Sequence, residues 1–317
     1  MSQDIDLCAM KILITGGAGC LGTNLIDHWN PKEHTIAVID NFVTGHKASL
    51  ADYVEVHEGS VVDASFVERV FEAFRPECVI HCAASYSDPD DWEGDALTNI
   101  VGAINILNAS RDIGVKRFVN LQTALCYGIP RETPIRVDHP ISPFTSYGIS
   151  KSAGEHYVLM SELNVVSLRL ANITGPRLAI GPIPTFYNRL KNEQSCFCTE
   201  AVRDFLDIED FLELMDIVIS DTSGTGVFNV STGEGHSIKE IYDVVRRYLE
   251  IDFGEDAPIL PVGDDDVPVV VLDATKTKAV FGWEPKVDFE SMMYRMLRWY
   301  DENGVTAVYS HLKGPKE

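Results

Sequence analysis

The chain has 317 residues and carries 48 acidic against 26 basic side chains, which gives a formal charge of −22 at neutral pH. The length fits one large or two small domains, and hydrophobic residues at 45% with a mean hydropathy of −0.01 exclude a collagen, a disordered chain or a membrane bundle. The negative charge repels phosphate backbones, so no nucleic-acid partner is expected, and no membrane partner is expected because no apolar run approaches roughly 20 residues.

The first half of the chain alternates short apolar segments with segments of helical period. The apolar segments are rich in Val, Ile and Leu without polar alternation, as in strands covered on both faces. Predicted strands span residues 11–15, 35–40, 54–57, 78–83, 117–122 and 165–170. Predicted helices span residues 20–29, 64–74, 96–113 and 147–163, with Gly114 placed to end the third. This alternation predicts an α/β fold with a doubly wound parallel sheet, the Rossmann fold.

The rhythm changes after Asn172, where Pro176, Pro182 and Pro184 interrupt the pattern. Further helices are predicted at 185–192, 236–249 and 289–303, and one more strand at 228–231. This shorter part is expected to form a smaller α/β substrate domain on the carboxyl edge of the sheet. The expected division is a dinucleotide-binding domain over 1–172, joined by 207–232, and a substrate-binding domain over 173–206 and 233–317.

The seven cysteines are scattered and stand mostly in apolar surroundings, as reduced thiols would in the cytoplasm. They are Cys8, Cys20, Cys78, Cys82, Cys126, Cys196 and Cys198. The N-terminus carries acidic residues where a signal peptide carries basic ones, so a cytoplasmic location is expected. No metal site is expected, because Cys196 and Cys198 lack a matching His/Cys pair and the acidic run 264–266 is typical of a solvated loop.

Residues 15–22 read Thr-Gly-Gly-Ala-Gly-Cys-Leu-Gly, directly after the first predicted strand and at the start of a helix. Gly16, Gly19 and Gly22 permit a tight turn that lets backbone N–H groups approach a pyrophosphate. Asp40 ends the second predicted strand. A carboxylate there accepts hydrogen bonds from both adenosine-ribose hydroxyls and repels a 2′-phosphate, which predicts NAD rather than NADP as the cofactor.

Tyr147 and Lys151 stand four residues apart, on one face of the fourth predicted helix. A free tyrosine has a pKa of about 10, and a neighbouring ammonium and a cationic nicotinamide both favour the phenolate. Thr123 follows the fifth predicted strand, at the edge where open α/β sheets bind ligands. Its hydroxyl can contact both a substrate oxygen and the phenol, so Thr123, Tyr147 and Lys151 are the predicted catalytic residues.

Together these motifs resemble the extended short-chain dehydrogenase/reductase family, and most of all its nucleotide-sugar epimerase branch, the relatives of UDP-glucose 4-epimerase. The resemblance runs in one register from about Met10 to about Trp299. It includes the glycine loop, Asp40-Asn41-Phe42, residues 79–84, Asn99, Thr123, Tyr127-Gly128, Tyr147, Lys151, residues 168–172, 175–177, 202–205 and 282–285.

The resemblance implies an NAD-dependent nucleotide-sugar epimerase that inverts a hydroxyl centre, preferably C4 of a UDP-hexose or derivative, for surface polysaccharide precursors. Tyr147 would take the proton from the sugar hydroxyl, and Thr123 would orient that hydroxyl. Lys151 would bind the nicotinamide ribose and lower the pKa of the phenol. The resulting keto-sugar would turn over in the site and be reduced on its other face.

The resemblance also implies the contacts of each ligand. The expected NAD contacts are Gly16, Gly19, Cys20, Leu21, Gly22, Asp40, Asn41, Ser60, Val61, Cys82, Ala83, Ala84, Asn99, Tyr147 and Lys151. The expected substrate contacts are Ala84, Thr123, Tyr147, Asn172 and Arg203. Asn172 would contact the sugar diphosphate and Arg203 a phosphate, but Asn172 can instead be a buried loop cap, and Arg203 can pair with Asp207. Helices 96–113 and 147–163 would form the four-helix bundle of a homodimer.

Three departures from the family pattern bear on the function. Ala124 and Leu125 replace the Asp-Glu pair of the 4,6-dehydratases, which disfavours loss of water because the general acid and base are missing. Ser60 stands where an Asp is usual, so the adenine contact is missing or moved. Residues 261–264 read Pro-Val-Gly-Asp without the Arg that grips the diphosphate in many epimerases, which leaves the nucleotide open.

Two alternatives remain. A keto-sugar-nucleotide reductase is disfavoured by Asp40, because biosynthetic reduction usually draws on NADPH. A catalytically silent NAD-binding regulatory protein is disfavoured because Thr123, Tyr147 and Lys151 are all present.

Overall fold

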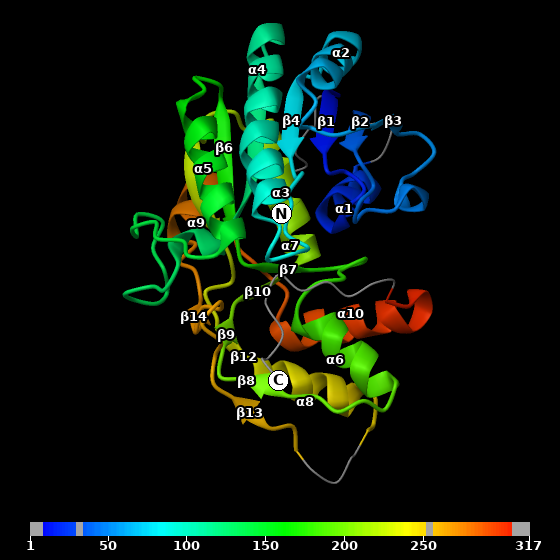
Figure 1. Cartoon of the computed structure of the whole chain (residues 1–317), viewed down its shortest axis with the longest axis vertical. Coiled ribbons are helices and arrows are strands. Elements are labelled where there is room, and N and C mark those ends of the chain that lie inside the picture. The colour runs from blue at the N-terminus through cyan, green and yellow to red at the C-terminus, as the bar shows by residue number, and fades with distance from the viewer. Residues whose placement is uncertain (1–8, 30–33, 252–255, 306–317) are drawn as a thin grey trace.

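The computed structural model describes residues 9–29, 34–251 and 256–305, so the predictions for Cys8 and the acidic N-terminal segment lie outside the described residues. Seven parallel strands form the main sheet in the order β11-β6-β5-β4-β1-β2-β3. They are β1 (Lys11–Thr15), β2 (Thr35–Asp40), β3 (Glu55–Glu58), β4 (Cys78–His81), β5 (Arg117–Thr123), β6 (Val165–Leu170) and β11 (Gly226–Val230). The predicted doubly wound sheet is confirmed, since the strand order reverses at β1 (Figure 1).

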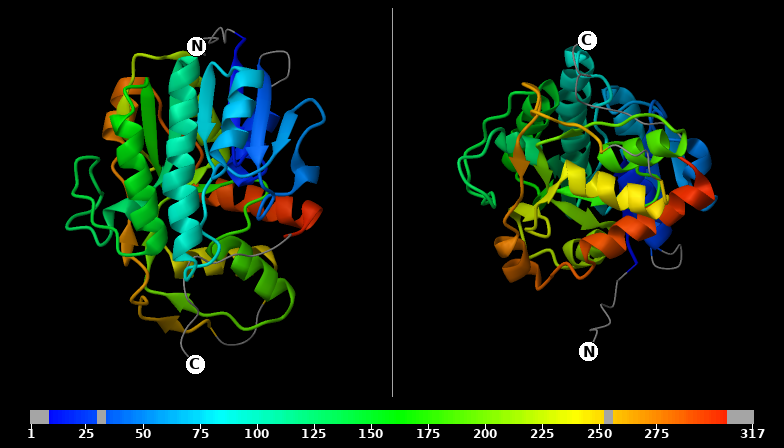
Figure 2. Two further views of the ribbon diagram at one scale, coloured as in Figure 1. Left: turned by 45° about the horizontal axis from the view of Figure 1, so that its top comes forward. Right: turned by 90° about the horizontal axis from the view of Figure 1, so that it is seen from below.

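Helices cover both faces of this sheet (Figures 1 and 2). One face packs against α2 (Ala64–Phe74), α4 (Ala103–Ile113) and α5 (Ser146–Met160), through an apolar core that includes Phe71, Ile106 and Val158. The other face packs against α1 (Cys20–His28), α7 (Ile208–Ser220) and α9 (Thr275–Phe281), through a core that includes Leu25, Phe211 and Phe281. Both faces are covered, which explains why the predicted strands lack polar alternation.

The predicted helix 96–113 is longer and less regular than its sequence pattern indicates. It is a continuous run of α3 (Trp92–Ala96), a π-helical segment (Leu97–Gly102) and α4, and it ends at Gly114 in the left-handed conformation, as predicted. The wider turn fits close neighbours: a Cβ on Gly102 would lie 2.5 Å from Val61 Cγ2, and one on Gly154 would lie 2.3 Å from the Asn99 carbonyl oxygen. Periodicity in the sequence does not reveal such an inserted turn.

The C-terminal part lies below the carboxyl ends of the strands in Figure 1. Its core lies among α6 (Pro182–Lys191), α8 (Ile238–Tyr248) and α10 (Phe289–Asn303). Three small sheets accompany them: β7 (Asn172–Thr174) with β10 (Phe205–Asp207), β9 (Val202–Arg203) between β12 (His236–Ser237) and β14 (Val269–Val270), and β8 (Cys198–Thr199) with β13 (Ile259–Leu260). Two short 3₁₀ helices occupy Lys47–Ser49 and Ala124–Tyr127.

The sequence analysis missed α7, α9 and these short strands. Strands of two or three residues carry no readable period. Helix α7 had a readable start, because Asp207 accepts a hydrogen bond from Glu209 N at 2.8 Å as its N-cap and apolar residues follow at helical spacing. The helix predicted at 236–249 begins in the structure at Ile238, two residues later than predicted. His236 and Ser237 pair with β9 instead, and Ser237 forms a capping box with Glu240.

The described cysteines are all free thiols: Cys20, Cys78, Cys82, Cys126, Cys196 and Cys198. Among the described residues, no cluster of three or more His, Cys, Asp or Glu side chains is arranged to hold a metal ion. Within the same ranges, each helix is too short or too polar to span a bilayer.

Candidate active site

A cavity of about 730 Å³ follows the carboxyl edge of the main sheet, with the C-terminal part as its other wall. The loops after β1 to β5 contribute one side, and α5 contributes Tyr147 and Lys151. The other side comes from β7, α6, β8, β9 and β10, the first residue of α8, and the segment that includes Asp266 and Val270. The cavity therefore lies where the topology of the sheet predicts a ligand.

The glycine loop after β1 has no room for side chains. Gly16 has a φ of +66°, and a Cβ there would lie 2.7 Å from the Cα and N of Ala83. A Cβ on Gly22 would lie 2.5 Å from the Cα of Gly17, so α1 begins in direct contact with the turn before it. Gly19 is the N-cap of α1, and no side chain caps that end of the helix. The first turn of α1 thus keeps backbone N–H groups without intrahelical acceptors beside the cavity, as a pyrophosphate requires.

Asp40 is fixed at the end of β2 by backbone amides. Its Oδ2 accepts a hydrogen bond from Ala18 N at 2.9 Å, and its Oδ1 accepts one from Phe42 N at 2.8 Å. The residue is only 7% exposed, yet it lines the cavity. Each carboxylate oxygen keeps a further lone pair, so the geometry leaves Asp40 able to accept two ribose hydroxyls.

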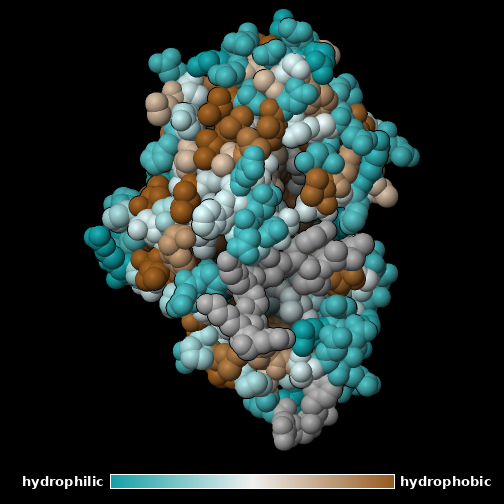
Figure 3. Space-filling view, in the orientation of Figure 1, coloured by the Kyte–Doolittle hydropathy of each residue, from teal (hydrophilic) through white to brown (hydrophobic). Residues whose placement is uncertain are grey.

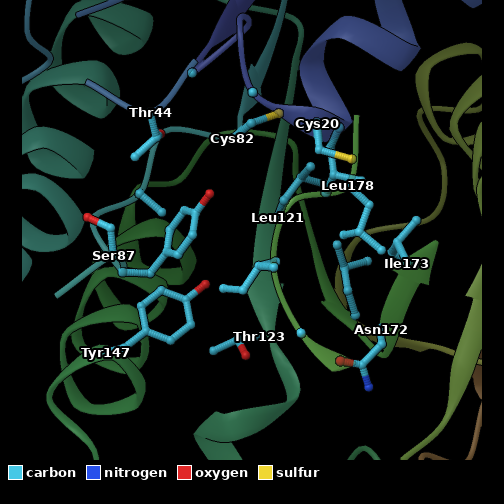
Figure 4. Close-up of a pocket in the computed structure, with 18 of the residues that line it drawn as sticks. Cys20, Thr44, Cys82, Ser87, Leu121, Thr123, Tyr147, Asn172, Ile173 and Leu178 are labelled. Carbon is cyan, nitrogen blue, oxygen red and sulfur yellow. The ribbon is translucent and has the colours of Figure 1, made fainter. Parts of the chain in front are cut away.

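The remaining predicted cofactor residues also line this end of the cavity, with one exception. Cys20, Leu21, Asn41, Ser60, Val61, Cys82, Ala83 and Ala84 all belong to the wall. The Ser60 hydroxyl accepts a hydrogen bond from Val62 N at 3.2 Å, so it is partly used within its own loop. Burial raises the pKa of both the Cys20 and Cys82 thiols to about 12, which keeps them protonated (Figure 4).

The exception is Asn99, which lies behind the wall rather than in it. Its Nδ2 donates to the Ser85 carbonyl and to Ser150 Oγ, each at 3.0 Å, and its Oδ1 accepts from Ser85 N at 2.9 Å. The side chain is therefore engaged within the protein and holds the loop that follows β4. The structure gives Asn99 a supporting position where the sequence analysis expected a cofactor contact.

Thr123 and Tyr147 both line the middle of the cavity, from the end of β5 and the first turn of α5, and Figure 4 shows them side by side. Thr123 Oγ1 accepts from Leu125 N at 3.2 Å, which caps the 3₁₀ helix and orients the hydroxyl. Thr145 caps α5 in the same way, through Gly148 N at 3.1 Å. Two capped helix starts thus place the predicted acid–base pair together.

The surroundings of Tyr147 in the chain alone act against the phenolate that is expected with NAD bound. Burial holds its pKa above the ordinary value of 10, nearby Tyr86 and Asp95 add to this, and a hydrogen bond with Thr123 opposes it. The Lys151 ammonium does not reach the phenol but donates to the Leu121 carbonyl at 2.8 Å. Burial lowers the pKa of Lys151 to about 8, against the opposing effects of Cys82 and Glu155. The surrounding protein therefore favours the neutral phenol, and the expected lowering by Lys151 is not found in the chain alone.

At the opposite end of the cavity stand Asn172 and Arg203. Asn172 is exposed and its Nδ2 donates to the Asp204 carbonyl at 3.0 Å, so the alternative of a buried loop cap is wrong. Arg203 is mostly buried and pairs with Asp266, whereas Asp207 pairs with Arg295 at 3.3 Å. The alternative pairing of Arg203 with Asp207 is therefore wrong. So is the assignment of the whole acidic run 264–266 to solvent, because Asp266 lies in the wall.

Several wall residues were not singled out from the sequence: Ser85, Tyr86, Ser87, Thr98, Thr185, Phe197, Thr199 and Asp266. The Tyr86 ring packs edge-on against Tyr147, with 6.1 Å between ring centroids. The run 85–87 carried a usable signal, because polar residues directly after a buried strand point to the ligand edge of a parallel sheet. Phe197 and Thr199 had none, since the short strand that places them has no pattern of its own.

Comparison with known proteins agrees with this geometry. Residues 12–231 match the NAD dependent epimerase/dehydratase family, and the chain belongs to that family. Its cofactor is NAD. The turn Gly16–Gly22, the uncapped start of α1 and the fixed carboxylate of Asp40 fit such a dinucleotide.

Individual relatives narrow the class. The chain is 58% identical to WbmG of Bordetella bronchiseptica, solved in complex with NAD and UDP, over 97% of this chain and 100% of that one, with a TM-score of 0.92. It is 29% identical to UDP-glucose 4-epimerase of Thermotoga maritima, solved with UDP-glucose, over 92% and 99% of the two chains, with a TM-score of 0.86. It is 29% identical to UDP-glucose 4-epimerase of Mycolicibacterium smegmatis over 301 residues, 88% and 94% of the two chains. The expected class, an NAD-dependent nucleotide-sugar epimerase, is confirmed.

Proposed function

We propose that this enzyme inverts C4 of a UDP-hexose or a derivative, through a transient keto-sugar. The observation that carries the proposal is the meeting of the Thr123 hydroxyl and the Tyr147 phenol in one cavity, between a dinucleotide loop and a second wall that carries Arg203. The relatives solved with UDP and with UDP-glucose support the nucleotide. Ala124 and Leu125 support epimerisation over dehydration, because neither can act as general acid or base.

The proposed roles follow from the positions in the wall. Thr123 donates to or accepts from the reacting hydroxyl, and Tyr147 exchanges its proton with that hydroxyl. Bound NAD supplies reversible two-electron redox chemistry at the sugar carbon. Its positive charge adds to that of Lys151 and favours the phenolate, which opposes the effect of burial on Tyr147. The keto-sugar would then present its other face, the two-electron step would run in reverse at the same carbon, and the return of the proton from Tyr147 to the oxygen would complete the inversion.

Each wall of the cavity binds a different ligand. The segments 1–172 and 207–232 hold NAD through the glycine loop and Asp40. The segments 173–206 and 233–317, together with Asn172, hold the nucleotide diphosphate, with the Arg203 guanidinium as the cation beside it. Because Asp266 already holds the Arg203 guanidinium in place, the side chain loses little further conformational entropy when it binds a phosphate.

The first test separates an epimerase from a net reductase. The purified protein is denatured and NAD in the supernatant is quantified, while the native protein is assayed on a panel of UDP-, GDP- and dTDP-sugars without added cofactor. Stoichiometric NAD with turnover of a UDP-sugar supports the proposal. A requirement for added NADPH would contradict it.

The second test addresses the acid–base pair. Tyr147→Phe is expected to lower kcat by at least about 100-fold while bound NAD is retained, because only the transferable proton is removed. Tyr53→Phe is the matched control, since Tyr53 donates to the Ile26 carbonyl at 2.8 Å and does not line the cavity. Equal activity of Tyr147→Phe and the control would contradict the role of Tyr147, whereas NAD binding without turnover of any sugar nucleotide in the panel would support a silent NAD-binding protein.

The homodimer is a further part of the proposal. Exposed apolar side chains gather on the face that α4 and α5 present in Figure 3. The π-helical segment and α5 carry these large exposed apolar or aromatic side chains: Leu97, Val101, Ile149, Tyr157, Leu159 and Met160. The same face on a second copy would bury this surface in a four-helix bundle. Met160, which is 75% exposed, tests the bundle as Met160→Glu. Light scattering should detect a dimer that this substitution weakens and that Val280→Glu, on α9, does not.

We also propose a cytoplasmic location. The free thiols among the described cysteines support it, because reduced cysteines are the rule in that compartment. Fractionation of the producing cell is the test, and recovery in the exported fraction would contradict the proposal.

A further inference from the structure

Asp204 is a completely buried carboxylate that the roles above do not use. It joins β9 to β10, at the point where the chain leaves the three-stranded sheet and enters the two-stranded one. The side chains before and after it, Arg203 and Phe205, both line the cavity, but Asp204 itself does not. It therefore stands directly behind the proposed substrate wall.

The carboxylate gathers hydrogen bonds from two segments distant in the sequence. Its Oδ1 accepts from Thr232 N at 3.0 Å and from Thr232 Oγ1 at 2.7 Å. Its Oδ2 accepts from Gly233 N at 3.0 Å and from Leu272 N at 3.3 Å. Thr232 and Gly233 follow β11 of the main sheet, and Leu272 follows β14. One side chain thus ties the main sheet to both small sheets.

The backbone of Asp204 makes hydrogen bonds that link this fixed connection to residues of the cavity wall. Its carbonyl accepts from both Asn172 N and Asn172 Nδ2, each at 3.0 Å. Its own N–H donates to the Val270 carbonyl at 3.0 Å, four residues from the Asp266 that holds Arg203. Asn172 and Arg203, the two polar groups assigned to the nucleotide diphosphate, are therefore both adjacent to this one residue.

We propose that Asp204 is a positioning residue for the nucleotide-sugar subsite: through its four accepted hydrogen bonds it fixes the β9–β10 connection against the turn at 232–233 and the segment at Leu272, and so sets Asn172 and Arg203. The inference rests on the proposed function, since it assigns these two residues to the substrate. It assigns no contact with the ligand to Asp204 itself.

A buried carboxylate that ties segments together also stabilises the fold, so the chain must supply a comparison. Asp210 on α7 provides one, because it is 2% exposed and its oxygens accept from Lys286 N at 2.9 Å and Val287 N at 3.0 Å. None of these three residues lines the cavity. Asp210 is thus a cross-link of the same chemistry without a neighbour in the substrate wall.

The experiment compares Asp204→Asn, Thr232→Val and Asp210→Asn with the unmodified holoenzyme. Calorimetry measures the binding of UDP, and steady-state kinetics on the UDP-sugar found active give KM and kcat. Bound NAD is quantified after denaturation, and stability is measured by urea unfolding. Asp204→Asn places an amide among N–H donors, and Thr232→Val removes one donor. Asp204→Asn should raise the Kd for UDP and the KM about tenfold, with kcat within about twofold and NAD unchanged. Thr232→Val should act in the same direction to a smaller extent, and Asp210→Asn should lower stability alone.

The outcomes separate this inference from the proposed function. If the unmodified enzyme neither binds UDP nor turns over a UDP-sugar, the proposed function fails. If it does both, and Asp204→Asn and Thr232→Val bind UDP as tightly as Asp210→Asn does, the positioning role is overturned. A fall in kcat at constant KM would overturn it as well. Should Asp204→Asn fail to fold, Thr232→Val decides by the same criterion.

Discussion

The two walls of the cavity are built in different ways. On the cofactor side, backbone groups fix the functional residues: Gly16 is packed against the backbone of Ala83, and Asp40 is held by two main-chain amides. On the substrate side, side chains do this work. Arg203 is held by the carboxylate of Asp266, and the carbonyl that holds Asn172 belongs to Asp204, itself anchored through its side chain.

The difference reflects where each wall comes from. The cofactor wall follows consecutive strands of one sheet, so its geometry is set by strand pairing and by the turn after β1. The substrate wall combines Asn172, Arg203, Asp266 and Val270, which no single sheet contains, and residues near 232 and 272 support it from behind. A change in one wall should therefore leave the ligand of the other wall bound. The first two predictions below test that independence, and the third concerns a residue outside both walls.

The largest effect is expected on the cofactor side. Asp40→Ala removes the acceptor for the ribose hydroxyls and should weaken NAD binding about 100-fold, while discrimination against NADP relaxes. Affinity for UDP should not change. Asp63→Ala is the control, because Asp63 caps α2 through Phe66 N at 3.0 Å, away from the cavity, and its loss should lower stability slightly without changing NAD binding. Calorimetry with each ligand measures both effects, and unchanged NAD affinity would refute the assignment of Asp40.

On the substrate side, Arg203→Gln should raise the Kd for UDP about tenfold or more, because a charged hydrogen bond to a phosphate is lost. NAD content should stay as in the unmodified enzyme. The matched control is Arg295→Gln, which breaks the ion pairs with Asp207 and Glu209 but touches no wall residue assigned to the substrate. A loss of NAD together with UDP would show that the walls are coupled after all.

The smallest effect concerns stability outside both walls. Asp301 on α10 accepts from Tyr187 OH at 2.7 Å, Tyr248 OH at 2.5 Å and Lys191 Nζ at 2.9 Å. Those hydrogen bonds, with that of Tyr248 the largest, lower the pKa of Asp301 to about 2. Because the folded pKa lies below the unfolded value, the carboxylate stabilises the fold above about pH 4, and this contribution disappears as the pH falls toward 2.

Asp301→Asn should accordingly cost no more than about 1 kcal/mol at pH 7, since the side chain is half-exposed and screened by solvent. The difference from the unmodified enzyme should shrink between pH 4 and pH 2 in urea unfolding. Glu302→Gln on the same helix is the control. A cost that persists unchanged at pH 2 would mean that the hydrogen bonds to Asp301 do not depend on its charge.

The difference between the cofactor side and the substrate side also explains which elements could be predicted from the sequence. Several elements begin and end at the predicted residues: β1, β2, β6, α2 and α10. A buried strand or an amphipathic helix has a hydrophobic pattern that is visible in its own residues. The 2- and 3-residue strands of the substrate side are too short to show a hydrophobic pattern. Their pairing depends on distant partners, Asn172 with Phe205 and Val202 with Val269, so β7, β9 and β14 are recognised only in the folded chain.

The candidate site divides similarly. The predicted residues lie in the cavity wall apart from Asn99, since most of them follow a strand end or the glycine turn, and Tyr147 and Lys151 share one face of α5. Their individual roles stay predictions. Asp266 and Asp204 could not be assigned, because an acidic residue in a loop has the same pattern whether it faces water or meets a buried guanidinium. The pKa of Tyr147 could not be foreseen either, since it depends on how deeply the ring is enclosed.

The π-helical segment Leu97–Gly102 has a consequence for engineering this chain. One additional residue in a single turn rotates everything before it by about 100° relative to a regular helix. Removing a residue there would restore ideal geometry and make the isolated helix more regular. It would also swing Trp92–Ala96 around the axis and away from the loop at Ser85, so a change that improves local regularity would dismantle one rim of the catalytic chamber.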